Sequence, residues 1–224
     1  MGGTAVKELD SAKVLSAINR LRASRPDVFG ADGHGFVLNP PLCETDVQAF
    51  EHQHRISLPD DYRQFITRIG NGGAGPYYGV FPLGQMDGLG ESLKPWQEAD
   101  GFVGVLSEPF LFRDAWNDLR RKPAKELMKT DEHEYELQLD EFESVYWGSA
   151  LMNGAIPICH EGCALRIWIV LCGPEAGHLW YDGRADYTGL SPLFSRDGSR
   201  AMFGGWYREW LEDALTGTAP AKRT

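Results

Sequence analysis

The chain has 224 residues, of which 42% are hydrophobic and seven are tryptophan, so it can bury the core of one domain, with or without an extension. Its formal net charge of -10 argues against nucleic-acid binding, because phosphate contacts require lysine and arginine, and favours a basic protein partner. Without a long apolar run or an apolar signal core after Met1, the sequence predicts a cytoplasmic protein that does not enter a membrane.

The first quarter of the chain predicts a helix, a loop and the start of a second helix. Residues 11–23 are expected to be helical, with an apolar stripe made of Val14, Leu15, Ile18 and Leu21. Residues 24–43 are rich in glycine and proline and are expected to form a loop, with a short strand at 36–38. The segment 45–48 has the form of a capping box and opens the second helix.

The next helix has both of its ends written into the sequence. Pro59 suits the first helical position, and Asp60 and Asp61 in the first turn favour the positive end of the helix dipole. The expected apolar face consists of Tyr62, Phe65, Ile66 and Ile69. The glycine-rich segment 70–75 then stops the helix, and because it follows a helix instead of preceding one, it is not a phosphate loop.

The middle of the chain changes character several times. Residues 77–83 are aromatic and apolar and predict a strand, residues 84–100 predict a loop, and residues 110–121 have helical spacing that Pro123 ends. Tyr77 and Tyr78, at the start of the predicted strand, are candidates for partner binding.

Residues 126–143 carry eight acids against Lys129 alone, which accounts for -7 of the total charge of -10. One interpretation is a solvated helix face or a flexible insert. The other is an electrostatic landing site for a basic partner. The candidate partner-binding side chains are Glu132, Glu134, Glu136, Asp140, Glu141 and Glu143.

The last third predicts a sheet and a closing helix. Strands are expected at 155–158, 165–171 and 178–181, with a hairpin loop between the last two. A helix over 199–215 carries an aromatic stripe with Trp206 and Trp210, and such a stripe is more often core than binding groove. Residues 216–224 are expected to be a disordered tail.

The strongest chemical signal is Cys159-His160, followed by Cys163 and Cys172. The spacing does not match a zinc knuckle, which uses two C-x-x-C pairs, and neighbouring residues on a strand point to opposite faces. We therefore expect no metal, no cofactor and no catalytic residue. Four cysteines are too few for a disulfide framework in this length and should be reduced. An enzymatic or small-ligand site near Cys159, His160 and Asp182 stays open as an alternative.

Several of these segments, in this order, resemble the SMI1/KNR4 family of the SUKH superfamily. The segments that resemble the family are residues 49–51, the helix at 58–66 with its glycines, the strand at 153–158, the hairpin at 171–182 and the aromatic residues of the last helix. The resemblance covers about residues 42–215. Residues 1–41 add a helix and a loop, and residues of about 95–145 form a long, charged insert.

The resemblance implies an α+β fold, with a mostly antiparallel sheet packed by helices. It also implies a non-enzymatic protein-binding module, because similar proteins often serve as bacterial immunity proteins that bind a cognate toxin, frequently a nuclease, and block it. A toxin nuclease that grips phosphates tends to be basic and would suit an acidic inhibitor. The alternative within the family is a regulatory scaffold, as in its fungal members.

Overall fold

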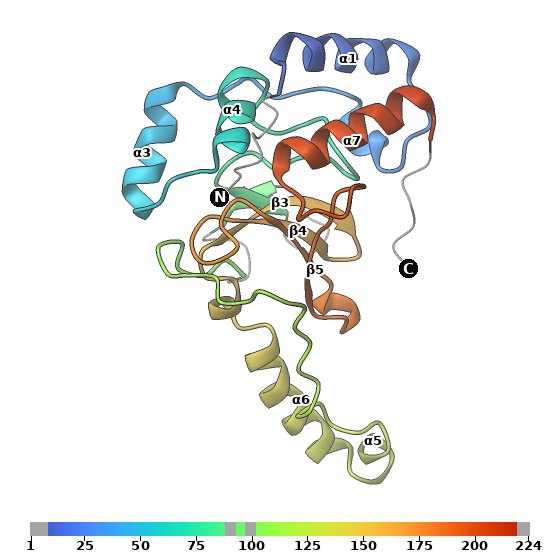
Figure 1. Cartoon of the computed structure of the whole chain (residues 1–224). Helices are drawn as coiled ribbons and strands as arrows, with labels where there is room; N and C mark the ends of the chain where they lie inside the picture. Colours follow the sequence, from blue (N-terminus) through green and yellow to red (C-terminus); the bar gives the residue numbers. More distant parts are fainter. Residues whose placement is uncertain (1–8, 88–92, 97–101, 219–224) are drawn as a thin grey trace.

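A computed structural model describes residues 9–87, 93–96 and 102–218. The fold is α+β: helices gather on one side of an antiparallel sheet, and a helical arm projects from the other side (Figure 1). The helices are α1 (Ser11–Ser24), α2 (Ala31–His34), α3 (Glu44–His54), α4 (Asp60–Arg68), α5 (Leu127–Thr130), α6 (Glu132–Tyr146) and α7 (Phe203–Thr216). The strands are β1 (Gln85–Asp87), β2 (Leu93–Pro95), β3 (Ala155–Gly162), β4 (Leu165–Val170), β5 (Leu179–Asp182) and β6 (Leu190–Pro192).

The main sheet has the order β3-β4-β5-β6, with all neighbours antiparallel. Its register pairs Trp168 with Trp180 and Ile167 with Tyr181, so the two faces carry different side chains. One face contributes Ile167 and Ile169 to the larger hydrophobic core. The other face contributes Trp168 and Trp180 to a smaller core. A strand that is apolar on both faces is covered on both sides, as expected for 165–171.

Helices α4 and α7 lie over the first face, and α1 packs on α7 on the side away from the sheet (Figure 1). The start of α4 also supports the start of α7, because the Asp61 carboxylate accepts hydrogen bonds from Tyr62 N and Gly204 N, both at 2.8 Å. Asp61 is only 3% exposed, and this burial raises the pKa of its carboxyl group despite those bonds. The prediction of acids in the first turn is confirmed, and Asp61 stabilises two helix starts instead of one.

The predicted strand at 77–83 is wrong. The segment turns, and it meets β3 through an isolated bridge of Val80 with Cys159 and through Tyr78 N and Phe81 N, which donate to the carbonyls of His160 and Ile158. Tyr77 and Gly79 have positive φ values of 54° and 99°, which an extended strand does not contain. A Cβ on Gly79 would lie 2.5 Å from the Gly73 carbonyl oxygen, so the turn also requires glycine there.

The predicted helix at 110–121 is also wrong. Phe110 N donates to the carbonyl of Cys172, and Trp116 and Leu190 exchange two backbone hydrogen bonds along the edge of β6. Phe110, Phe112 and Trp116 of this segment pack onto the second face of the sheet, around Trp180. Because its backbone groups bond to the sheet, they are not available for a helix.

Several boundaries differ from the sequence expectations. The predicted loop at 84–100 contains β1 and β2, which pair as a small antiparallel hairpin, and residues 88–92 and 97–100 lie outside the described part. Helix α3 begins at Glu44 after Cys43, without a side-chain cap, so the capping box at 45–48 is wrong. Helix α7 begins only at Phe203, because Ala201 bonds to the backbone of Leu179 and Leu193. The predicted tail falls largely on residues 219–224, outside the described residues.

Candidate functional site

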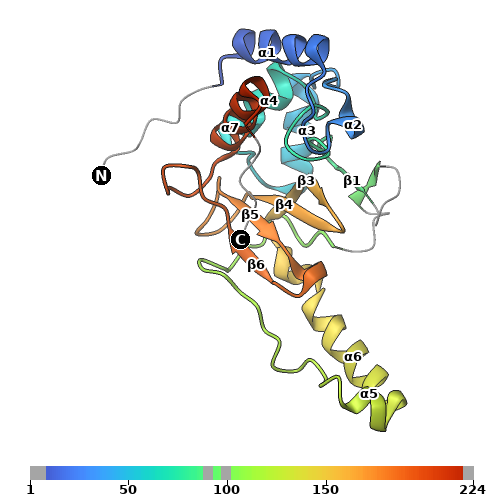
Figure 2. The same cartoon turned by 90° about the vertical axis from the view of Figure 1, so that its right-hand side faces the viewer.

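The acidic run of the sequence forms α5 and most of α6, within an arm that we define as residues 118–146. In both views the arm projects from the body, away from α1 and α7 (Figures 1 and 2). Five acidic side chains on α6 are exposed: Glu132, Glu134, Glu136, Asp140 and Glu141. Asp131 caps the helix by accepting a hydrogen bond from Glu134 N, so the acids at the start of α6 also suit the helix dipole.

The base of the arm is fixed to the sheet by a buried ion pair. Arg184 is 0% exposed and donates to both oxygens of Asp182, at 2.8 Å from Nε and 2.7 Å from Nη2. Its Nη1 donates to the carbonyl of Tyr146, and its guanidinium lies 5.3 Å from the ring of Trp147. The last turn of α6 is therefore held by a charged group that is itself held by β5.

Aromatic side chains complete this attachment. Phe142 and Tyr146 are buried and stack on each other, and Tyr146 also stacks on Trp116. The hydroxyl of Tyr146 donates to Asn117 Oδ1 at 2.8 Å. The anchored end of α6 is therefore rigidly placed, whereas Glu132, Glu134 and Glu136 lie farther out along the helix.

Glu143 differs from the other acids of the run. It is half-buried, and its Oε1 accepts a 2.7 Å hydrogen bond from the hydroxyl of Tyr187. Burial, together with this hydrogen bond, raises the pKa of Tyr187 to about 12. The geometry therefore gives Glu143 a role in attaching the arm to the body, which separates it from the five exposed acids.

The arm also carries positive charge that the acidic run alone does not reveal. The segment leading into α5 contains Arg120, Arg121, Lys122 and Lys125, so residues 118–146 hold nine acids and five bases. Lys122 lies over the ring of Tyr187, next to Glu143, while Arg120 pairs with Asp118 at 2.7 Å. The arm therefore has charges of both signs, with the acidic excess on α6.

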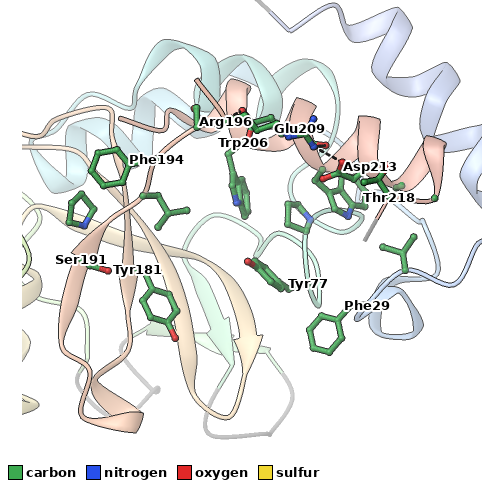
Figure 3. A pocket seen from close by; sticks show the side chains of 18 of the residues that line it. Phe29, Tyr77, Tyr181, Ser191, Phe194, Arg196, Trp206, Glu209, Asp213 and Thr218 are labelled. Atoms are coloured by element: carbon green, nitrogen blue, oxygen red, sulfur yellow. Dashed lines mark hydrogen bonds and ion pairs between the residues drawn. The ribbon is translucent and has the colours of Figure 1, made fainter. Parts of the chain in front are cut away.

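The two tyrosines predicted as partner contacts line different depressions. Tyr77 lies in an aromatic groove of about 870 Å³ between α7 and the β6 edge of the sheet (Figure 3). Tyr78 is 41% exposed and lines a hollow of about 550 Å³ together with His34 and His160. Phe29 contacts both tyrosine rings edge-on. The aromatic side chains of the groove are Phe29, Tyr77, Tyr181, Phe194, Trp206 and Trp210.

Trp206 and Trp210 belong to the larger hydrophobic core, at 9% and 8% exposure, as the sequence predicts. Both side chains also line the groove, so they belong to the core and to the groove at once. Sequence reasoning missed Phe29 and Phe194 as groove residues, because single exposed aromatics in loops give no periodic signal. It also missed the Asp182–Arg184 pair, for which the only sequence signal is the two-residue spacing.

The cysteine and histidine candidates do not converge on one site. Cys159 is buried, and its thiol donates to the carbonyl of Pro76. In the sheet register, His160 on β3 and Asp182 on β5 both pair with Arg166 on β4, which lies between them. The Asp182 carboxylate forms an ion pair with Arg184. Within the described ranges no cluster of three or more potential metal ligands is present. Across the same ranges no helix has the length and apolar character needed to cross a membrane.

Comparison with known proteins gives one match. The family model described as the SMI1 / KNR4 family (SUKH-1) matches residues 41–195, well over half of the chain. No curated protein and no solved structure matches the chain. The matched range contains the main sheet and the arm, whereas α1, Phe29 and α7 lie outside it.

Proposed function

The chain belongs to the SMI1/KNR4 family (SUKH-1), and from this premise we propose that it binds and neutralises a cognate toxin with a basic surface. Family membership supports a protein-binding module of the immunity type, and members of the family are generally not enzymes. A toxin nuclease that binds phosphates is one partner with the required positive charge. The observation that carries the proposal is the row of exposed carboxylates on the projecting helix α6.

The shape and charge of the arm support this role. Exposed carboxylates contribute little to folding, so their accumulation on one helix is not explained by stability. On a projecting element they are accessible to a partner, and opposite charges speed the encounter of two proteins. The buried attachment through Arg184 and Phe142 keeps this charged helix in a fixed position relative to the body.

We propose that this encounter takes place in the cytoplasm. All four cysteines are free thiols, including the exposed Cys43 and Cys163. Unpaired, exposed thiols are typical of a reducing compartment.

The experiment measures association with a toxin domain identified by co-purification with the chain. Replacing Glu136, Asp140 and Glu141 by their amides removes three exposed charges beyond the first turn of α6. We expect the association rate at low salt to fall roughly three- to tenfold, and its salt dependence to weaken. The melting temperature should stay nearly unchanged, because exposed charges contribute little to stability.

A matched control removes three exposed carboxylates from the body, at Asp32, Asp46 and Glu108. This variant should keep the native association rate. Equal rates for the arm variant, the body variant and the native protein would overturn the role of α6. Failure of any toxic polypeptide to co-purify would overturn the proposed neutralisation itself.

A further inference from the structure

The aromatic groove, of about 870 Å³, has not yet been given a role. Helix α7 forms one side, residues 27–29 and 76–77 form another, and the β6 edge with residues 193–196 forms the third (Figure 3). Phe29 and Phe194, on opposite sides, are 55% and 59% exposed. A volume of about 870 Å³ lies within the range of ligand-binding pockets. Two large, exposed aromatic side chains at one depression indicate a binding surface.

The charges around the groove have one predominant sign. Its lining contains three carboxylates, from Asp27, Glu209 and Asp213, and a single cation, Arg196. Arg196 is already engaged by α7: it forms an ion pair with Asp213 at 2.5 Å, and its backbone N–H donates to Glu209 Oε1. The Asp27 carboxylate is exposed and makes no hydrogen bond or ion pair within the described part of the chain. The groove therefore presents net negative charge beside aromatic rings.

We propose that this groove binds an extended segment of a partner polypeptide in which an arginine is flanked by apolar side chains. A guanidinium can pair with a carboxylate and stack on an aromatic ring, and the groove offers both kinds of group side by side. Apolar neighbours of the arginine would cover the exposed rings of Phe29 and Phe194. This site is separate from the arm, so it goes beyond the proposed function and does not depend on it.

Recognition here uses side chains and not the addition of a strand. The edge strand β6 contains Pro192, which lacks an N–H group, and Leu190 already pairs with Trp116. An added strand would therefore find few free donors on this edge. Phe29 and α7 also lie outside the residues that match the family model, so the match does not cover the whole groove.

The test titrates the full chain with a short capped peptide that has one arginine between two leucines, observed by nuclear magnetic resonance. We expect saturable binding with a dissociation constant below about 1 mM. The variants Asp27→Asn and Phe194→Ala should each weaken it about fivefold, because each removes one exposed interaction. Both side chains are exposed, so folding should be retained, as thermal melting would verify.

Matched controls make comparable substitutions outside the groove. Leu111→Ala removes an apolar side chain that is 76% exposed outside the groove, and Asp46→Asn removes an exposed carboxylate on α3. Neither should change the affinity, and a peptide with glutamate in place of arginine should not bind. The proposal is overturned if no saturation occurs, if the glutamate peptide binds equally well, or if Asp27→Asn and Phe194→Ala leave the affinity unchanged. These outcomes leave the association test on the arm unaffected.

Discussion

Replacing Arg184 by alanine should destabilise the protein strongly, because it leaves a buried carboxylate without its cation. Arg184 is 0% exposed and Asp182 is 4% exposed, and the carboxylate accepts from Arg184 Nε, Nη2 and the backbone N–H at 2.8, 2.7 and 3.1 Å. Breaking a buried pair by removing one partner costs about 3–5 kcal/mol. We expect a loss of this size in the free energy of unfolding, measured by urea denaturation at pH 7.

The chain contains a natural control for this experiment. Arg120 and Asp118 have the same two-residue spacing and the same 2.8 and 2.7 Å hydrogen bonds from Nε and Nη2, but the Arg120 side chain is 88% exposed. Arg120→Ala should leave the unfolding free energy unchanged within error, because water replaces an exposed pair. The two pairs match in their arginine–carboxylate hydrogen bonds, and Arg184 differs by its burial and by its further contacts with Tyr146 and Trp147.

Two further measurements make the reasoning refutable. A double-mutant cycle with Asp182→Asn should give a coupling of about 2 kcal/mol, because each single variant leaves the other group buried and unpaired. Hydrogen exchange in the last turn of α6 should accelerate in Arg184→Ala, since the hydrogen bond to the Tyr146 carbonyl is lost. A loss below about 1 kcal/mol, or additive single effects, would refute the assignment of Arg184 as the anchor of the arm.

Two other predictions concern the core around α7. Trp210→Ala should lower the free energy of unfolding in urea by about 3–5 kcal/mol, because Trp210 is 8% exposed and packs against Tyr207 and Phe36. A loss under about 1 kcal/mol would mean that Trp210 lines the groove without supporting the core. Burial raises the pKa of Asp61 above 3.8, so the folded state binds this proton more tightly, and stability from Asp61 falls as the pH rises from 3.8 through the raised pKa. The unfolding free energy of the native protein, minus that of Asp61→Asn, should therefore decrease as the pH rises over that range. A difference that does not change with pH would contradict this prediction.

The elements that the sequence predicts correctly are those with local signals. The α4 helix has a proline, first-turn acids and terminal glycines within a short stretch, and α4 lies over Asp60–Arg68, with Pro59 as its N-cap instead of its first helical residue. The apolar runs at 155–158, 165–171 and 178–181 correspond to β3, β4 and β5. In each case the residues that decide the structure are neighbours in the sequence.

The failures have the opposite character. Residues 110–121 have helical spacing of apolar side chains, but their backbone groups bond to Cys172 and Leu190, which are far along the chain. The groove is assembled from five separate segments, and no one of them suggests a site. Glu143 looks like the other acids of its run, yet Tyr187, 44 residues away, occupies its carboxylate. Such long-range pairings cannot be read from local patterns.

The charge pattern of the arm adds a constraint that composition alone hides. Under the proposed function, the acidic excess on α6 would attract a basic partner, and the bases Arg121 and Lys125 would repel it from the neighbouring segment of the same arm. Attraction and repulsion placed side by side favour one orientation of the partner over others, because like charges facing each other across an interface are costly. The rigid attachment at Tyr146 and Arg184 preserves this orientation relative to the body. The arm is therefore suited to setting the orientation of a bound partner as well as the rate of its approach.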